Sequence, residues 1–407
     1  MAFNPHLAIT FGRFEMHLEH STPFRPTFQV AILAACSVVI VAKTGCSMVS
    51  EADDRIFAEA SPSEANGLTI AANTPIAHDH NALGIDSLAW KPGIDNLAVL
   101  SDAGQTVSIL KPPNWQVAAQ FEASSEGVGY GDPIAFFSED KIVAAEAATN
   151  SEGASYTLRI RDLRTGHVAA TLPTSSGARK LSLRQPLVVA SSPTSNRLAV
   201  TLTGLTTGSS RPHDVLALYS DNPSSSPRTI AVSKTVEALT FSPDGNTVAI
   251  GFNDGSIALI RFDDAVPRAE YNGGAKGSCT ALAFSGSGDH LAAGFASESG
   301  DHHIEILNVP TGSSVANLKM PVFDYGGRPG TPRISSLSWS KFEDRLAAGS
   351  EDAVRVWTNA SQSPKILFER HMRKSSTGHL PYGPYKLKFS DSGVLAVGTG
   401  NSVTILK

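Results

Sequence analysis

The chain has 407 residues, of which 41% are hydrophobic and 17% are charged, and it contains 34 glycines and 24 prolines. Scarce charge with plentiful Gly and Pro favours a loop-rich β protein over a helical one, and this length suits several domains or one large β unit. The formal net charge is −5, so the chain lacks the excess of positive charge that is typical of nucleic-acid-binding proteins. No nucleic-acid partner is therefore expected.

The three cysteines, Cys36, Cys46 and Cys279, are too few for a disulfide framework in a body of this size. No two of them have the C-x-x-C spacing of a zinc or redox site. Cys279 lies in a predicted inner strand, where we expect a buried structural thiol.

The N-terminal part of the chain predicts export. Val30–Ala42 (VAILAACSVVIVA) is an apolar run of 13 residues, short of the ~20 needed to span a bilayer but within the roughly 7–15 residues of a secretory signal core. We therefore expect residues 1–46 to be a signal peptide or membrane anchor, and the protein to be periplasmic or tethered to a membrane in the cell envelope.

Two cysteines in this segment resemble the lipidated cysteine of bacterial lipoprotein signals. Leu33–Cys36 fits the family pattern but lies inside the apolar run, whereas Thr44–Ser47 places Cys46 just after the run, with Lys43 where the family has Leu. Lipidation at Cys46, an uncleaved anchor and simple cleavage all stay open. Residues 47–66 are rich in Ser, Glu, Asp and Ala and predict a polar linker.

The clearest structural signal is Val236–Phe262, with the sequence VEALTFSPDGNTVAIGFNDGSIALIRF. Three short runs rich in β-branched and aromatic residues are separated by Ser-Pro-Asp-Gly and Asn-Asp-Gly. Pro presets φ, Asp bonds its own backbone and Gly accepts a positive φ, so both separators are turns. The stretch therefore predicts three consecutive antiparallel strands.

Weaker copies of this pattern recur along residues 67–407. The first strands of the seven copies are predicted to end at Trp90, Phe137, Ser191, Phe241, Phe284, Trp339 and Phe389, at intervals of 43 to 55 residues. A near-regular period of this size indicates the blades of a propeller. We therefore predict an all-β, seven-bladed β-propeller over residues 67–407.

The last copy reaches Lys407 without a fourth strand, while Leu68–Ala72 precedes the first copy and has no partner of its own. A ring of blades closes best when one blade takes strands from both parts of the chain. We expect Leu68–Ala72 to be the outer strand of the last blade.

These copies resemble the WD40-repeat family of β-propellers. The resemblance covers about residues 67–407 and is strongest in Leu239–Gly245 (LTFSPDG) and Asn253–Ile257 (NDGSI). The family's Trp-Asp and Gly-His pairs are absent, and TolB-like and lactonase-like propellers, which share the four-stranded unit, stay open as labels. The resemblance implies a non-catalytic scaffold for protein–protein interaction, which we expect to be a monomer.

Candidate partner-binding residues lie in the connections from a fourth strand to the next first strand. Tyr stands beside Gly in three of these connections, and two of them also carry basic residues. Tyr and Arg on neighbouring loops are typical of interaction hot spots, although each Tyr could instead pack its own loop against the blade. The predicted partner-binding residues are Tyr130, Tyr325, Arg328, Arg333, Arg370, Arg373 and Tyr382.

Several histidines suggest a metal site at the same end of the ring, because imidazole and carboxylate groups suit zinc. They are His78, His80, His302, His303, His371 and His379, with Asp301 beside two of them. None has the spacing of a helical zinc site, so we predict no metal and no cofactor.

The chain carries no motif that predicts an enzyme. It has no G-x-S-x-G elbow, no P-loop and no G-x-G-x-x-G between a strand and a helix. The alternative is a lactonase- or hydrolase-type propeller enzyme with carboxylates at the channel mouth, because such a site is assembled from several blades and leaves no local motif.

Overall fold

The computed structural model describes residues 68–76, 84–102, 104–123, 131–150, 153–176, 179–180, 182–183, 187–205, 212–263, 269–272, 277–297, 300–324, 329–350, 352–371, 386–400 and 402–407. The predicted signal or anchor at 1–46, the linker at 47–66 and Cys46 lie outside these residues. In the part of the chain that is described, no helix is long and apolar enough to cross a membrane.

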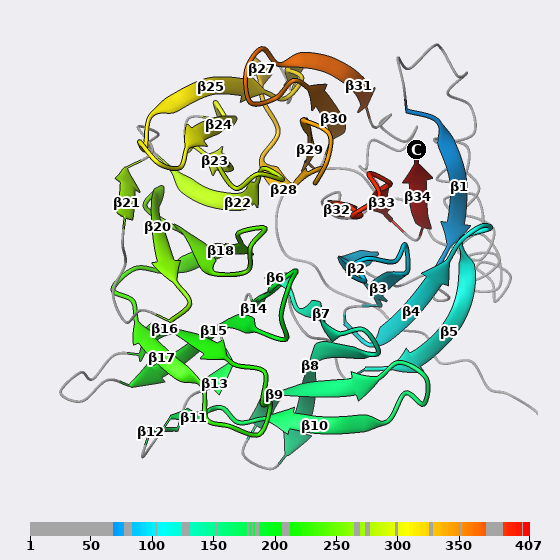
Figure 1. The fold of residues 1–407 in the computed structure, drawn as a ribbon, viewed down its shortest axis with the longest axis vertical. Coiled ribbons are helices and arrows are strands. Elements are labelled where there is room, and N and C mark those ends of the chain that lie inside the picture. The colour runs from blue at the N-terminus through cyan, green and yellow to red at the C-terminus, as the bar shows by residue number, and fades with distance from the viewer. Residues whose placement is uncertain are drawn as a thin grey trace, which may run out of the picture. The chain divides into compact units, whose positions relative to one another are not determined.

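The described residues of the unit Met48–Lys407 form seven four-stranded antiparallel blades (Figure 1). Blades 1 to 3 comprise β2 (Ile85–Trp90), β3 (Leu97–Ser101), β4 (Thr106–Lys111) and β5 (Gln116–Glu122); β7 (Ile134–Ser138), β8 (Lys141–Asn150), β9 (Gly153–Asp162) and β10 (Val168–Leu172); and β14 (Leu187–Ser191), β15 (Leu198–Leu205), β16 (Pro212–Tyr219) and β17 (Arg228–Ala231). Blades 4 and 5 comprise β18 (Val236–Phe241), β19 (Thr247–Phe252), β20 (Ser256–Arg261) and β21 (Ala269–Asn272); and β22 (Ser278–Phe284), β23 (His290–Ala296), β24 (His303–Asn308) and β25 (Ser314–Lys319). Blade 6 comprises β28 (Ile334–Trp339), β29 (Arg345–Ser350), β30 (Ala353–Thr358) and β31 (Lys365–His371), and blade 7 comprises β32 (Lys386–Phe389), β33 (Leu395–Thr399), β34 (Ser402–Leu406) and β1 (Ile70–Pro75).

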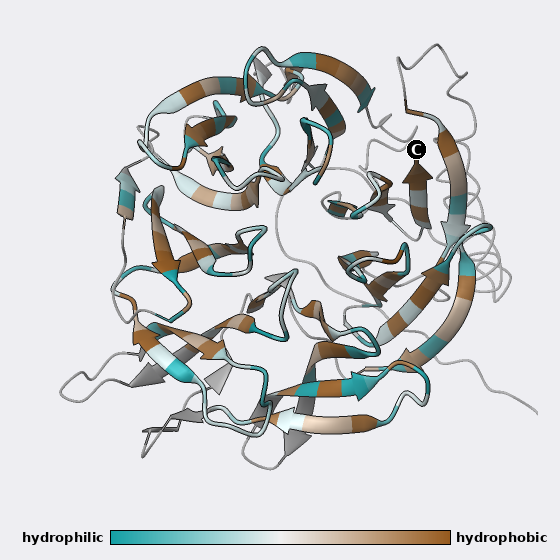
Figure 2. Ribbon diagram, in the orientation of Figure 1, coloured by the Kyte–Doolittle hydropathy of each residue, from teal (hydrophilic) through white to brown (hydrophobic). Residues whose placement is uncertain are grey.

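Each blade is covered on both faces by its neighbours. The residues Leu97–Leu100 of β3 are completely buried, as expected where a strand has apolar contacts on both faces and its sequence is continuously apolar. The hydrophobic clusters join adjacent blades, and one of them packs Trp90 and Val99 of blade 1 against Ala396 and Ile405 of blade 7. Figure 2 shows hydrophobic residues along the strands in every blade.

Glycines in the second strands receive side chains from the next blade. A Cβ at Gly251 would lie 2.6 Å from Cys279 Sγ, and one at Gly398 would lie 2.6 Å from Ile85 Cγ2. The pair Gly398–Ile85 joins the last blade to the first in the same way as Gly251–Cys279 joins two central blades. Cys279 is fully buried, and burial raises the pKa of its thiol, which agrees with the expected structural role.

Strand β1 closes the ring, as predicted. It pairs antiparallel with β34, and the backbones of Thr69 and Lys407 exchange two hydrogen bonds of 2.7 and 2.9 Å. The strand runs over Ile70–Pro75 rather than the predicted Leu68–Ala72. Trp90 of blade 1 also donates its Nε1–H to the Lys388 carbonyl of blade 7 at 2.7 Å.

The predicted strand ends hold for six of the seven first strands, and in blade 2 the strand continues past Phe137 to Ser138. Blades 2 and 3 have longer central hairpins, with strands of 10 residues in β8 and β9 and of 8 residues in β15 and β16. Short strands of two residues lie in the connections between blades. They are β6 (Gly131–Asp132), β11 (Ser175–Ser176), β12 (Arg179–Lys180), β13 (Ser182–Leu183), β26 (Phe323–Asp324) and β27 (Pro329–Gly330). β6 pairs in parallel with the inner strand β14 of blade 3, which the sequence pattern did not predict.

Candidate partner-binding site

The connections between blades and the hairpins between second and third strands share one end of the ring, called here the channel mouth. Five of the predicted partner-binding residues, Tyr130, Tyr325, Arg328, Arg373 and Tyr382, lie outside the described residues, as do His78, His80 and His379. Arg333 is exposed immediately before β28, and Arg370 is half-buried in β31 opposite Val354. These two arginines are therefore the predicted residues that the structure places.

Four inner strands carry a β-bulge at their second or third residue, next to the channel mouth. The register shifts there leave Asp86, Glu237, Thr280 and Ser335 opposite no partner residue. A bulge re-aims the side chain of its extra residue, and here that residue is polar in every case. The signal in the sequence is a polar residue at the same place in otherwise apolar first strands, as in IDSLAW and VEALTF, and the bulges were not predicted from it.

Three of these bulged residues have structural hydrogen bonds. The Asp86 carboxylate accepts from Gly104 N–H at 2.7 Å, in the hairpin of its own blade. Thr280 Oγ1 donates to the Ile334 carbonyl of the next blade at 2.6 Å, and Ser335 Oγ donates to the Gly349 carbonyl at 3.0 Å. The bulges therefore brace the channel mouth.

A cavity of about 120 Å³ lies among the inner strands of blades 3 to 7, with Glu237, Thr280 and Lys386 among its lining residues. Small-molecule sites usually occupy roughly 300–1,000 Å³. This cavity is smaller, so the described part of the channel does not resemble a pocket for a substrate of ordinary size.

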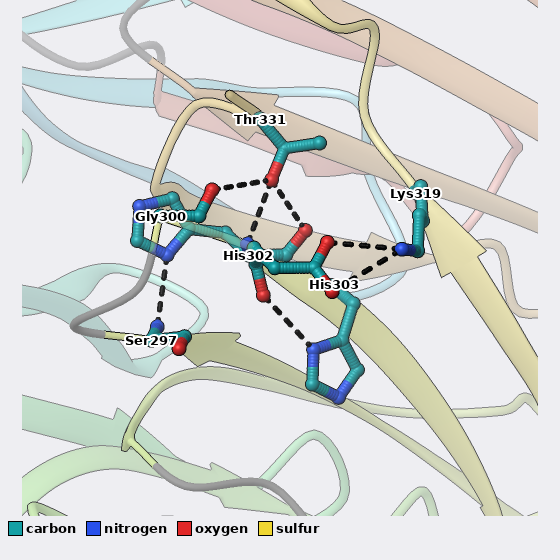
Figure 3. Close-up of polar contacts among 7 residues, drawn as sticks. Ser297, Gly300, His302, His303, Lys319 and Thr331 are labelled. Carbon is teal, nitrogen blue, oxygen red and sulfur yellow. Dashed lines mark hydrogen bonds and ion pairs between the residues drawn. The ribbon is translucent and has the colours of Figure 1, made fainter. Parts of the chain in front are cut away.

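The hairpin of blade 5 is fastened to the connection that leads to blade 6 (Figure 3). Thr331 Oγ1 accepts a hydrogen bond from His302 N–H at 2.7 Å and lies 2.8 Å from the His302 carbonyl, to which it can donate its own proton. Thr331 N–H donates to the Gly300 carbonyl at 3.2 Å. Lys319 adds an ion pair of 2.9 Å with Asp301 on the same hairpin. Two loops of the channel mouth thus form one braced surface beside Arg333.

The imidazole of His302 takes part in this bracing. Its Nδ1 accepts a hydrogen bond from Ser297 N–H at 2.9 Å, which requires that Nδ1 carry no proton. Burial lowers the pKa of His302, and the nearby positive charge of Arg333 lowers it further, against the opposing effect of Asp301. Native His302 is therefore neutral, with its ring proton on Nε2.

These contacts bear on the metal hypothesis. Nδ1 of His302 already accepts a hydrogen bond from Ser297 N–H. The ring of His303 stacks on the ring of Phe295, with centroids 5.4 Å apart. Within the described ranges, no group of three or more His, Cys, Asp or Glu side chains could hold a metal ion. His302 and His303 have local structural contacts instead.

Acidification is expected to destabilise the protein through His302. Since the folded pKa is lowered from 6.5, the stabilisation is present above pH 6.5 and is lost as the pH falls toward the folded pKa. In His302→Asn, the amide oxygen can accept from Ser297 N–H but does not titrate. Melting temperatures of both proteins between about pH 7 and 5 should converge as the wild type loses stability, and parallel pH profiles would contradict this expectation.

Comparison with known proteins agrees with this architecture. The model of the family "WD domain, G-beta repeat" matches residues 226–260, which include β17, β18 and β19 and most of β20. The small ribosomal subunit protein RACK1 of Schizosaccharomyces pombe (strain 972 / ATCC 24843) is 31% identical over 123 residues, a match that spans 30% of this chain and 37% of that protein. A solved structure described as "Structure of U3-55K" superposes with a TM-score of 0.58 and 15% identity, covering 84% of this chain and 98% of that one. The chain is thus a seven-bladed β-propeller that contains a WD40 repeat.

Proposed function

We propose that this propeller is a non-catalytic scaffold that binds a protein partner at the channel mouth. The braced surface around Thr331 and His302, next to exposed Arg333, is the observation that carries the proposal. Loops held in a fixed arrangement lose little conformational entropy when a partner docks. The name of the similar RACK1 protein describes a component of a subunit, which supports a role in an assembly.

The proposal includes attachment to a membrane or export to the cell envelope through residues 1–46. Its support is the apolar run Val30–Ala42 and the position of Cys46 after it. Mass spectrometry of the mature N-terminus distinguishes the three forms. A lipid mass on Cys46, an intact N-terminus and an unmodified shortened N-terminus correspond to lipidation, an anchor and simple cleavage.

Substitution of the predicted tyrosines tests the partner site. The double variant Tyr325→Ala, Tyr382→Ala is expected to melt nearly as the wild type does and to capture partners from a membrane extract less well. A hot-spot side chain contributes about 2 kcal/mol or more to binding, so retention of partners should fall at least tenfold. Captured proteins would be quantified by mass spectrometry, with the full-length wild type as reference.

Arg333→Ala is expected to weaken capture in the same direction, and Arg164→Ala supplies its matched control. Arg164 is also exposed, at 78% of its side chain, but it lies in the turn between β9 and β10, at the end opposite the channel mouth.

Two results would contradict the proposed site. A large loss of stability in the variant Tyr325→Ala, Tyr382→Ala would favour the alternative that these rings pack their own loops. Equal loss of partners in Arg164→Ala would also contradict the proposed site.

A further inference from the structure

Exposed apolar side chains gather at the end of the ring opposite the channel mouth, called here the base. The base carries the turns from first to second strands and from third to fourth strands. Among the described residues, eight large hydrophobic side chains are exposed, and only Val322, which follows β25, lies at the channel mouth. The others lie at the base and are Ile70, Ile94, Val117, Val168, Val315, Phe342 and Ile366. Single exposed hydrophobic residues are ordinary, but this uneven distribution indicates a surface that contacts something other than water.

Most of these residues belong to blades 6, 7 and 1, which follow one another around the ring (Figure 1). Phe342, 78% exposed, and Ile94, 49% exposed, lie in the turns between the first and second strands of blades 6 and 1. Ile70, Val117 and Ile366 lie at the starts of the outer strands β1, β5 and β31. The apolar residues therefore lie in blade 7 and on both sides of it.

The turns at the base of these three blades are joined to one another. The Asp391 carboxylate, in the turn of blade 7, accepts a hydrogen bond from Gly93 N–H of blade 1 at 2.9 Å. The same carboxylate lies 3.5 Å from Lys341 Nζ of blade 6. Gly93 precedes Ile94, and Lys341 precedes Phe342. The two most exposed apolar side chains of these blades are thus presented by turns that a shared carboxylate holds together.

The turn of blade 6 also departs from the turn chemistry of its neighbours. In blades 4, 5 and 7, the hydroxyls of Ser242, Ser285 and Ser390 accept a backbone N–H across the turn at 2.9, 3.1 and 3.1 Å. Ser340 occupies the same place in blade 6 and is 1% exposed, and its Oγ has no hydrogen-bond partner among the described residues. Departures from a local rule are expected at functional sites, so this turn favours a binding role for Phe342.

Lysines accompany the apolar residues. The lysines at the base of blades 1, 6 and 7 are Lys91, Lys111, Lys341, Lys365 and Lys407. The carboxylates of the turns there have partners within the chain, and they are Asp95, Glu343, Asp344 and Asp391. A lysine can lay its methylene groups on an apolar surface and keep its ammonium group at a polar boundary. Apolar side chains surrounded by lysines are typical of surfaces that lie in the interface of a membrane.

The chain enters the propeller at the base. Ile70 pairs with Leu406, and Leu406 pairs with Leu395, which follows the turn of blade 7. Strand β1 therefore begins at this end, and the predicted linker at 47–66 and the apolar run Val30–Ala42 precede it in the sequence. A protein that is attached to a membrane through this run is tethered at its base, so the linker does not have to pass around the ring.

We propose that the base of blades 6, 7 and 1 rests on the surface of a lipid bilayer, with Phe342 and Ile94 inserted at the boundary between headgroups and acyl chains. The lysines contact anionic headgroups. The channel mouth then faces away from the membrane and is open to a protein partner. This inference rests on the membrane attachment proposed for residues 1–46, and it adds the face that the propeller turns toward the membrane.

Tryptophan reporters test the proposal in the full-length protein, reconstituted into vesicles of phosphatidylcholine and phosphatidylglycerol. The native tryptophans are buried, and they are Trp90, Trp115, Trp339 and Trp357. Phe342→Trp adds an exposed tryptophan at the base, and Val322→Trp is the matched control, because Val322 is 66% exposed at the channel mouth. Lipids with brominated acyl chains should quench the added fluorescence of Phe342→Trp at least about threefold more than that of Val322→Trp, because only the first side chain reaches the interface.

Substitutions around the reporter locate the contact. Ile94→Asp with Ile366→Asp, added to the Phe342→Trp variant and checked for folding by circular dichroism, should reduce its quenching at least about twofold, because carboxylates resist transfer into the interface. Val168→Asp with Val315→Asp is the matched control, because these residues are also exposed at the base but belong to blades 2 and 5. The control should leave the quenching unchanged.

Flotation of the protein with the vesicles measures attachment separately from the orientation of the propeller. Flotation without quenching of the Phe342→Trp variant would overturn this inference and leave the proposed attachment standing, whereas a protein that does not float would contradict both. Equal quenching of the two reporters, or an equal fall in the two double-aspartate variants, would also overturn the inference. Capture of protein partners at the channel mouth is measured independently of these results.

Discussion

A chain that begins at Asn81, and therefore lacks β1, is expected to lose its single cooperative unfolding transition, whereas a chain that begins at Asn66 keeps it. Without β1, strand β34 has an unpaired edge. Leu68 and Ile76, each 2% exposed, also lose their burial, at about 1.5–3 kcal/mol per side chain. The sum of about 3–6 kcal/mol is a large share of the roughly 5–15 kcal/mol that stabilises a folded protein.

Calorimetry and circular dichroism of both chains measure this effect. We expect a broad, early transition for the shorter chain and a single sharp one for the longer chain. Addition of a synthetic peptide covering residues 66–80 should restore part of the lost stability, because the strand can then pair with β34 from outside the chain. Equal midpoints and equal cooperativity in the two chains would contradict closure of the ring by β1.

The blades could be predicted from the sequence because each blade is built from neighbouring segments. Tight turns such as Ser242–Gly245 join strands that follow one another in the chain, so the information is local. The end of β1 was harder to predict, because Asn73 and Thr74 are polar and do not continue an apolar run. They remain in the strand because Asn73 pairs with Thr404 in the ladder and Thr74 Oγ1 donates to the Trp115 carbonyl at 2.8 Å.

The candidate site was less accessible to prediction. The spread of Tyr and Arg over the connections indicated the channel mouth, and of these residues the structure describes Arg333 and Arg370. The contact between His302 and Thr331 joins residues 29 positions apart, and neither residue belongs to a recognisable motif. Such pairs become visible only when the path of the connection is known, because Thr and His are common in loops for many reasons.

Among single substitutions, Glu146→Ala is expected to cost the most stability. The Glu146 side chain is 5% exposed and forms two ion pairs, with Arg159 Nη1 at 2.6 Å and with Arg161 Nη2 at 2.7 Å. Arg161 Nη1 also donates to the Gly166 carbonyl at 2.8 Å, and its guanidinium lies 5.9 Å from the ring centroid of Phe121 in blade 1. The cluster therefore joins two strands of blade 2 to the neighbouring blade.

Removal of Glu146 leaves the Arg161 guanidinium, 15% exposed, without its counter-ion in a poorly solvated place. Loss of one partner of a buried pair costs about 3–5 kcal/mol, and we expect about 3 kcal/mol because Arg159, 37% exposed, can turn toward water. Glu146→Gln keeps one acceptor oxygen and should lose less. Urea unfolding, with the midpoint and slope compared between variants, measures the difference.

The pair Arg164–Asp140 is the matched control, because it lies in the same blade and differs mainly in exposure. Its charged atoms are 3.8 Å apart, and the side chains are 78% and 46% exposed, so Asp140→Ala should cost about 0–1 kcal/mol. A comparable loss in both variants would mean that the effect comes from charge alone. A loss confined to Glu146→Ala would show that desolvation of the guanidinium determines the cost, since both substitutions remove one carboxylate from blade 2.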